Sequence, residues 1–260
     1  MNSRDYAYLE PRFAAMAHRG GWTRPADRAR ENTVHAFEAA LGLGFDYLET
    51  DVRTTADGRL VVFHDADLDR VTDATGPLAE RTWDELTEVR VNGTDAIPLL
   101  EDVVVRFPTA RFNIDLKDDR SVAVLAELAG RLGLADRIAV ASFSSARIRR
   151  FARSAPGIAL GASAIGVAWD GFAPFLRRIR IDPAPVLQVP ARALRNLVPL
   201  VRQDLVRFLH STDRKLHVWT VDDRDQMEQL LELGVDGLIS NDLVLLKQVL
   251  QERGLWRADQ

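Results

Sequence analysis

The sequence contains no cysteine, which excludes disulfide bonds, thiolate catalysis and a cysteine-ligated zinc site. It also lacks any apolar run close to the roughly 20 residues that span a bilayer, so no stable membrane insertion is expected. The first residues, MNSRDYAYLEPRF, are polar and charged and do not contain the apolar segment of a signal peptide. These absences together predict a cytoplasmic protein.

An excess of positive charge is missing as well. The 34 lysines and arginines are outnumbered by 38 acidic residues, which gives a net charge of -4 and argues against a nucleic-acid-binding surface. No Gly-, Pro- or Ser-rich linker interrupts the 260 residues. We therefore expect residues 1–260 to form a single domain. Nothing in the composition indicates an oligomeric state.

Short runs typical of β-strands alternate along the chain with stretches of helical periodicity. In the helical stretch 33–44, for example, Val34, Phe37 and Leu41 share one face. The strand-like runs are FAAMAH (13–18), DYLETDV (46–52), LVVFHD (60–65), RFNIDLK (111–117), IAVASF (138–143), IALGAS (158–163), VLQVP (186–190), LHVWTV (216–221) and DGLIS (236–240).

Eight strand–helix units remain when LVVFHD is set aside as an additional hairpin-like strand. Eight such units in a chain of this length predict a TIM (β/α)8 barrel. The irregular segment 66–97 is expected to be a small insertion on the barrel rim after the second strand. The alternative fold is a doubly wound open sheet.

Polar side chains follow the apolar runs, at the strand ends where TIM barrels place their active sites. These side chains are His18 and Arg19, Glu49 and Asp51, His64 and Asp65, and Asp115 and Lys117. Each has an ordinary explanation on its own: Glu-x-Asp is common on solvated strands, and Asp115 and Lys117 can pair with each other. Their concurrence at one end of the predicted barrel favours a functional site.

The spacing of the carboxylates indicates a cation. Glu49 and Asp51 are two residues apart, so both side chains point to the same face of a strand. Two carboxylates on one face repel unless positive charge lies between them. With Asp115 they offer three oxygen ligands, which suit Mg²⁺ or Ca²⁺.

The remaining histidines are expected to be structural. His35 in a helical stretch and His210 near a helix end are predicted to be exposed. His217 shares a strand face with Trp219, and we expect it to be a structural residue of the barrel.

Several segments resemble the glycerophosphodiester phosphodiesterase family, in the family's order and over nearly the whole chain. The segments are AHRGG (17–21), ENTVHAFEAAL (31–41), GFDYLETDVRTTADGRLVVFHDADLDRVT (44–72), IPLLEDVV (97–104), NIDLK (113–117), VASF (140–143), VWTVDD (218–223) and GVDGLISND (234–242). The resemblance implies a TIM barrel that hydrolyses small glycerophosphodiesters to sn-glycerol 3-phosphate and an alcohol.

The same resemblance implies eight site residues in three roles. They are His18 and His64 as acid and base, Glu49, Asp51 and Asp115 as ligands of one Mg²⁺ or Ca²⁺ ion, and Arg19, Lys117 and Trp219 as substrate contacts. Either histidine can act first, and the attacking group is either water or the glycerol 2-hydroxyl, which would form a cyclic phosphate. Gly20 and Gly21 are expected to let the backbone approach the phosphate.

Three departures from the family pattern stand out. Residue 115 is Asp where the family usually has Glu, so the ion is expected to lie closer to that strand, to bind through water or to bind less tightly. The segment TRPADRAR (23–30) before Glu31 is longer than usual, and ISNDL (239–243) lacks the family's Thr-Asp and following Pro.

Two other functions fit parts of the sequence. A phosphodiesterase of phospholipase D or phosphoinositide phospholipase C type acts on lipids and needs an apolar rim, whereas the insertion here is strongly charged. The segment WDGFAPFLRRIRI (169–181) is either an amphipathic outer helix or a membrane-facing patch. A barrel that only binds phosphodiesters is the other alternative, although this chain retains both histidines and all three acidic positions.

Overall fold

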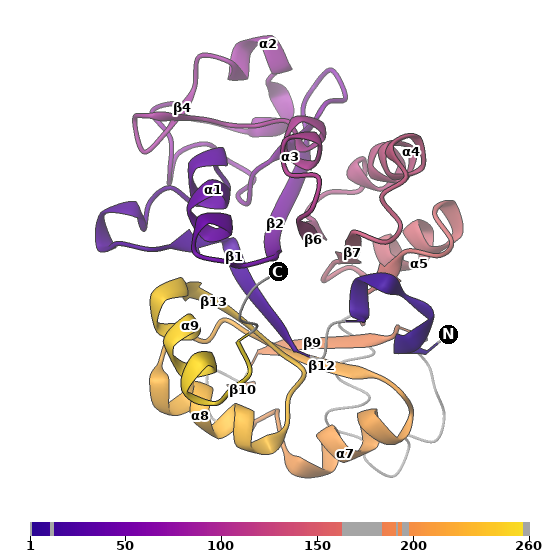
Figure 1. The fold of residues 1–260 in the computed structure, drawn as a ribbon. Coiled ribbons are helices and arrows are strands. Elements are labelled where there is room, and N and C mark those ends of the chain that lie inside the picture. The colour runs from indigo at the N-terminus through magenta and orange to yellow at the C-terminus, as the bar shows by residue number, and fades with distance from the viewer. Residues whose placement is uncertain (1, 11–12, 163–183, 191, 194–197, 257–260) are drawn as a thin grey trace.

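Eight parallel strands form the centre of the molecule. The structure is a computed structural model, and it describes residues 2–10, 13–162, 184–190, 192–193 and 198–256. The strands follow one another around the sheet in the order β8-β7-β6-β2-β1-β13-β12-β9 (Figure 1). A parallel bridge between Gly161 and Val186 links the two ends of this order. The closed ring confirms the predicted TIM barrel and excludes the doubly wound open sheet.

The barrel strands coincide closely with the predicted runs. They are β1 (Ala14–Trp22), β2 (Tyr47–Thr54), β6 (Arg111–Leu116), β7 (Ile138–Ala141), β8 (Ala159–Leu160), β9 (Val186–Pro190), β12 (Lys215–Trp219) and β13 (Gly237–Asp242). The short strands β10 (Arg192–Ala193) and β11 (Val198–Pro199) pair with each other outside the barrel.

Helices cover the outside of the barrel (Figure 1). They are α1 (Val34–Gly42), α3 (Leu100–Arg106), α4 (Ser121–Leu132), α5 (Ser145–Ser154), α7 (Gln203–Ser211), α8 (Arg224–Leu233) and α9 (Leu243–Glu252). Four of them begin at a side chain that accepts a hydrogen bond from the first turn, namely Thr33, Ser144, Asp223 and Asp242. The predicted amphipathic segment 169–181 lies outside the described residues.

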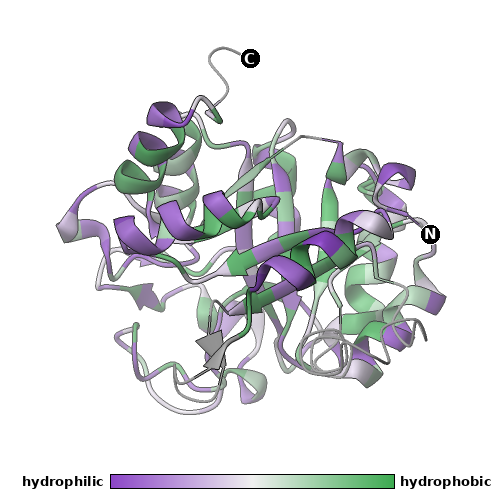
Figure 2. Ribbon diagram, turned by 90° about the horizontal axis from the view of Figure 1, so that it is seen from below, coloured by the Kyte–Doolittle hydropathy of each residue, from purple (hydrophilic) through white to green (hydrophobic). Residues whose placement is uncertain are grey.

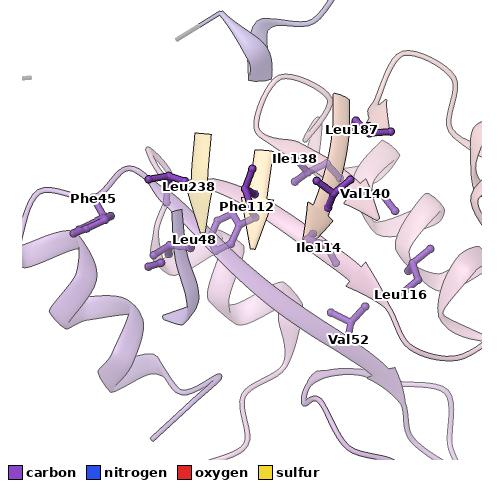
Figure 3. Close-up of a cluster of buried hydrophobic side chains, with 14 of the residues drawn as sticks. Phe45, Leu48, Val52, Phe112, Ile114, Leu116, Ile138, Val140, Leu187 and Leu238 are labelled. Carbon is purple, nitrogen blue, oxygen red and sulfur yellow. The ribbon is translucent and has the colours of Figure 1, made fainter. Parts of the chain in front are cut away.

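Alternation along the strands separates two layers of the core. The even-numbered residues of β2 and β6, such as Leu48, Phe112 and Ile114, point outward into a buried apolar cluster beneath the helices (Figure 3). The helices alternate hydrophilic and hydrophobic residues along their length (Figure 2), as expected for elements with one buried face. The odd-numbered residues point into the barrel, and these carry the site.

The N-terminal segment closes the barrel at the end opposite to the site. Two 3-10 turns, η1 (Ser3–Asp5) and η2 (Ala7–Leu9), bring Tyr8 against the barrel residue Tyr47, with ring centroids 5.1 Å apart and edge to face. Both rings are fully buried in a cluster with other inward-facing residues. This apolar plug keeps water from the lower half of the barrel.

The predicted insertion after the second strand has a small core of its own. Strand β3 (Leu60–Val62) pairs antiparallel to β2, and the chain then forms η4 (Leu78–Glu80), α2 (Trp83–Leu86) and the β4–β5 pair (Arg90–Val91, Asp95–Ala96) before α3. Its buried residues include Leu68, Leu78, Leu86 and Ile97. Among the residues with assigned positions, no helix is both long and apolar enough to cross a bilayer.

Candidate active site

A cavity of about 290 Å³ opens at the carboxyl ends of the barrel strands. All eight site residues expected from the sequence line it, and they are His18, Arg19, Glu49, Asp51, His64, Asp115, Lys117 and Trp219. Strand register explains part of this convergence, because Asp51 on β2 lies directly opposite Asp115 on β6. Their roles in catalysis and ion binding stay predictions.

The chain turns sharply where His18 and Arg19 enter the cavity. The pairing of β1 shifts between Ala17 and Trp22, and Arg19, Gly20 and Gly21 have φ angles of 53°, 83° and 60°. A Cβ on Gly20 would lie 2.7 Å from the Cβ of Ala36, and one on Gly21 would lie 2.6 Å from Leu243 Cδ2. The glycines therefore allow this turn to pack against α1 and α9, which is a different reason for glycine than the expected approach to phosphate.

Lysine and arginine side chains separate the three carboxylates. Lys117 Nζ lies 2.8 Å from Asp51 Oδ1 and 2.6 Å from Asp115 Oδ2. Arg19 Nε lies 3.1 Å from Asp51 Oδ2, and the Arg19 backbone N–H donates to Glu49 Oε2 at 2.9 Å. The simple Asp115–Lys117 pair considered from the sequence is thus present, but it belongs to a larger network.

The pKa values of two of the three carboxyl groups are raised, and that of the third is lowered. Burial, reinforced by the neighbouring Asp51 charge, raises the pKa of Glu49 well above its usual value. Burial also raises the pKa of Asp115 against the opposing effect of Lys117. Burial acts on Asp51 in the same sense, but Lys117 and Arg19 outweigh it, so the pKa of Asp51 is lowered. The site therefore contains more buried carboxyl groups than its cations hold ionised.

This donor set fits one further cation. Asp115 Oδ1 is buried and has no hydrogen-bond partner among the described residues, and carboxylate oxygens are the preferred ligands of Mg²⁺ and Ca²⁺. Within the same residues, no three histidine or carboxylate side chains are grouped closely enough to form a ready-made metal site. Glu49, Asp51 and Asp115 are the residues that would hold such an ion, and they would bind it in their deprotonated forms.

His18 is held by an amide that has its own fixed orientation. Its Nδ1 lies 2.7 Å from Asn241 Oδ1, and the Asn241 amide nitrogen donates to Asp222 Oδ2 at 2.7 Å. Since the amide oxygen can only accept, Nδ1 carries the proton and Nε2 is left to exchange one. Burial, together with the adjacent Arg19 charge, lowers the pKa of His18.

His64 is held by a carboxylate. Its Nδ1 lies 2.6 Å from Asp65 Oδ1, and Arg70 of the insertion donates from Nε to Asp65 Oδ2 at 2.5 Å. Arg70 also donates two hydrogen bonds to Glu31, at 3.0 and 2.6 Å, and Glu31 in turn accepts from Arg19 at 3.0 Å. One arginine of the insertion therefore links the partner of His64 to the partner of Arg19.

Aromatic rings and amides form the rest of the wall. Trp219 meets Phe143 edge to face at 5.8 Å, and Phe143 is 66% exposed. Deeper in the cavity, Gln188 Nε2 donates to Asn113 Oδ1 at 3.0 Å across the barrel. Only Trp219 of these four was expected at the site.

Sequence reasoning assigned no role to several of these groups. Asp65 directly follows the predicted catalytic residue His64, and Glu31 begins the ENT motif (31–33). These positions in the sequence were the available signal. Arg70 and Asp222 also lie inside the matching segments 44–72 and 218–223, but neither adjoins a predicted site residue, so nothing marked them out. Of the other histidines, His217 is fully buried in the barrel as expected.

His210 is largely exposed and pairs with Asp236 at 2.9 Å. His35 is only about one-third exposed, since its Nε2 lies 3.5 Å from Asp27, so the expectation of an exposed side chain was right for His210 and overstated for His35.

This chain is similar to known proteins in both sequence and fold. A sequence model of the Glycerophosphoryl diester phosphodiesterase family matches residues 18–245. The chain is 34% identical over 248 residues to the Mycobacterium tuberculosis protein named "Probable glycerophosphodiester phosphodiesterase 2", covering 93% of this chain and 92% of that protein.

Solved structures agree with this match. A glycerophosphodiester phosphodiesterase from Agrobacterium tumefaciens superposes with a TM-score of 0.73 at 25% identity, over 90% of this chain and 99% of that one. A phosphodiesterase from Oleispira antarctica, solved in complex with the product sn-glycerol-3-phosphate, superposes with a TM-score of 0.76 at 22% identity, over 92% of this chain and 96% of that one.

Proposed function

Because the chain belongs to the glycerophosphoryl diester phosphodiesterase family, we propose that it hydrolyses glycerophosphodiesters to sn-glycerol 3-phosphate and an alcohol with two histidines and a divalent cation. It is a phosphoric diester hydrolase, like the relatives that it matches. The proposed roles of the two histidines and of the cation rest on the cavity in which His18, His64, three carboxylates and two cationic side chains meet.

The two histidines are suited to exchange protons at Nε2. Each Nδ1 is fixed by a partner, Asn241 for His18 and Asp65 for His64, so each ring presents its other nitrogen to the reaction. One histidine accepts the proton of the attacking hydroxyl while the other donates a proton to the departing alkoxide. The bond from phosphorus to the attacking oxygen forms as the bond to the head-group oxygen breaks, which releases a neutral alcohol. Attack by water leaves glycerol 3-phosphate directly, whereas attack by the 2-hydroxyl leaves a cyclic phosphate that water then opens to glycerol 3-phosphate.

Arg19 and Lys117 are suited to hold the phosphoryl oxygens. Both side chains line the cavity, and Arg19 is itself oriented by Glu31 and Asp51. A guanidinium offers two parallel donors to a phosphate, and an ammonium offers a point charge. These contacts would neutralise the charge that otherwise resists attack at phosphorus.

Glu49, Asp51 and Asp115 are the residues that would hold the cation. When bound, such an ion polarises a phosphoryl oxygen and balances negative charge on the phosphorus centre. The protein's own contribution is to bury three carboxyl groups, two of which, Glu49 and Asp115, have raised pKa values, so a further cation would stabilise their ionised forms.

The decisive experiment measures turnover of glycerophosphocholine by release of glycerol 3-phosphate. His18→Ala and His64→Ala are each expected to lower kcat by at least about 10²-fold, whereas His210→Ala, which changes an exposed histidine outside the cavity, should leave kcat near that of the wild type. Near-normal turnover by either folded cavity variant would refute the catalytic roles.

The cation is tested separately. Dialysis against EDTA should abolish turnover, and Mg²⁺ or Ca²⁺ should restore it; full activity after exhaustive chelation would rule the ion out. ³¹P NMR of the same reaction shows whether a cyclic phosphate forms, and so distinguishes attack by the 2-hydroxyl from attack by water.

The two alternative functions are outcomes of the same assay. A purely binding barrel would bind the diester without turnover. A lipid-directed enzyme would prefer lysophospholipids, but Phe143 is the only large hydrophobic residue of the described chain that is both strongly exposed and part of the cavity lining. This sparse apolar surface favours a small substrate.

A further inference from the structure

A second, smaller cavity of about 210 Å³ lies on the other side of His18 and Arg19. These two residues line both cavities and so form the partition between them. Trp22, Arg28 and Asn241 line only the second one. The mechanism proposed above makes no use of this space.

The wall of the second cavity carries a positive charge that no acidic group in the described part of the chain pairs with. The guanidinium of Arg28 lies over the Trp22 ring, 5.1 Å from its centroid. Arg28 is exposed, and its side chain makes no ion pair with any residue that the structure describes. Arg24 and Arg30 on the same loop are both paired, with Asp27 and Asp95 respectively.

Resting on the function proposed above, we infer that the second cavity receives the head-group alcohol of the substrate, and that Arg28 makes it select polyol and anionic head groups over choline. The loop that carries Arg28, residues 23–30, is the segment that the family resemblance led us to expect to be longer than usual. Head-group choice would therefore be a property of this chain's own loop.

A substrate would extend into both cavities if its phosphorus atom lay beside His18. One of its two organic arms would then lie on each side of the partition formed by His18 and Arg19. The larger cavity presents the buried Asn113–Gln188 amide pair and the Trp219 ring, which are fixed groups suited to the glycerol arm that every substrate shares. The second cavity is built by a rim loop, and it suits the arm that differs between substrates.

The charges of the second cavity disfavour a quaternary ammonium. An aromatic ring attracts such a group through its face, but the face of Trp22 is already covered by the Arg28 guanidinium. Glu31, the only acidic residue among the described residues of the lining, is engaged by Arg19 and Arg70. A trimethylammonium would meet uncompensated positive charge there, whereas hydroxyls or a phosphate would find donors.

The test compares kcat/KM for three substrates that differ only in the head group: glycerophosphocholine, glycerophosphoglycerol and glycerophosphoinositol 4-phosphate. The wild type is expected to prefer the last two. Arg28→Gln should reduce the preference for the anionic substrate over the choline substrate by about fivefold, the scale of one exposed charge interaction, and chiefly through KM.

Arg24→Gln is the matched control, because it removes one positive charge from the same loop but from a side chain that is bound to Asp27. Its head-group ratios should equal those of the wild type. Arg28→Glu should shift the ratio further toward choline than Arg28→Gln does.

Three results would overturn the inference: a wild-type preference for choline, an equal loss on all three substrates in Arg28→Gln, or identical ratios in the two glutamine variants. An equal loss would place the shared glycerol arm beside Arg28 instead. Absence of turnover on every substrate would contradict the proposed function itself, and it is distinguishable from a change in ratios.

Discussion

His217 should make the folded protein sensitive to mild acid. It lies on the inner face of β12, opposite Gln188 of β9 and Gly237 of β13, and it is 0% exposed. Neither ring nitrogen has a hydrogen-bond partner in the described part of the chain. Burial, with a smaller effect of the Lys215 charge, lowers the pKa of His217 to about 3.

The free energy of unfolding should fall as pH falls below the pKa of histidine in an unfolded chain, about 6.5. Between that pH and about 3 the unfolded chain binds a proton that the folded chain refuses, so acid favours unfolding. At about pH 5 the His217 contribution is a loss of about 2 kcal/mol, from roughly 1.5 pH units at 1.36 kcal/mol each. Full burial means that solvent screening does not reduce this figure.

The assay is urea unfolding of the wild type and of His217→Leu at several pH values between about 7.5 and 5. Other groups titrate equally in both proteins, so the difference between the two unfolding free energies isolates His217. It should move by about 2 kcal/mol in favour of the leucine variant as the pH falls. Parallel curves, or an NMR titration of the His217 ring in the folded protein near pH 6.5, would refute the reasoning.

Three further predictions concern the site. Arg70→Ala should lower kcat by about tenfold with little change in KM, because it releases Asp65 from its 2.5 Å hydrogen bond; Arg70→Lys should restore part of the loss, and equal defects in both variants would indicate only a folding role. Asp115→Glu should lower the Mg²⁺ concentration needed for half-maximal activity after chelation by about tenfold, and an unchanged Mg²⁺ titration would contradict this. Gly21→Ala should cost about 2 kcal/mol or more in urea unfolding, since its Cβ would lie 2.6 Å from Leu243 Cδ2 at a φ of 60°; unfolding at the wild-type urea concentration would contradict the clash.

Periodicity predicted the fold and the gathering of seven of the eight site residues, whereas Trp219 was expected at the site only from the family resemblance. The two-residue spacing of Glu49 and Asp51 correctly placed both side chains on the inner face of one strand, and the strand ends brought them to one cavity. Local patterns of this kind are visible in sequence because neighbouring residues determine them.

Pairing between distant side chains was not visible in the same way. The spacing rule predicted that positive charge must lie between the carboxylates, and in the structure Lys117 and Arg19 supply part of it. Nothing in the sequence indicated that Arg70 would bind both Asp65, five residues away, and Glu31, 39 residues away. Nor did the polar start of the chain indicate that Tyr8 would plug the barrel, because that contact depends on the closed ring.

The polarity of the barrel interior changes along its axis, and this gradient connects the fold to the chemistry. On β2 the inward side chains pass from Tyr47, packed on the plug residue Tyr8, to Glu49 and then Asp51. The apolar floor below excludes water, so the burial that raises the pKa of Glu49 is a direct consequence of the plug and the closed ring. A carboxylate in that position is stable only beside positive charge. The buried apolar side chains in the lower half of the barrel therefore give the carboxylates at the carboxyl ends of the strands their affinity for cationic groups.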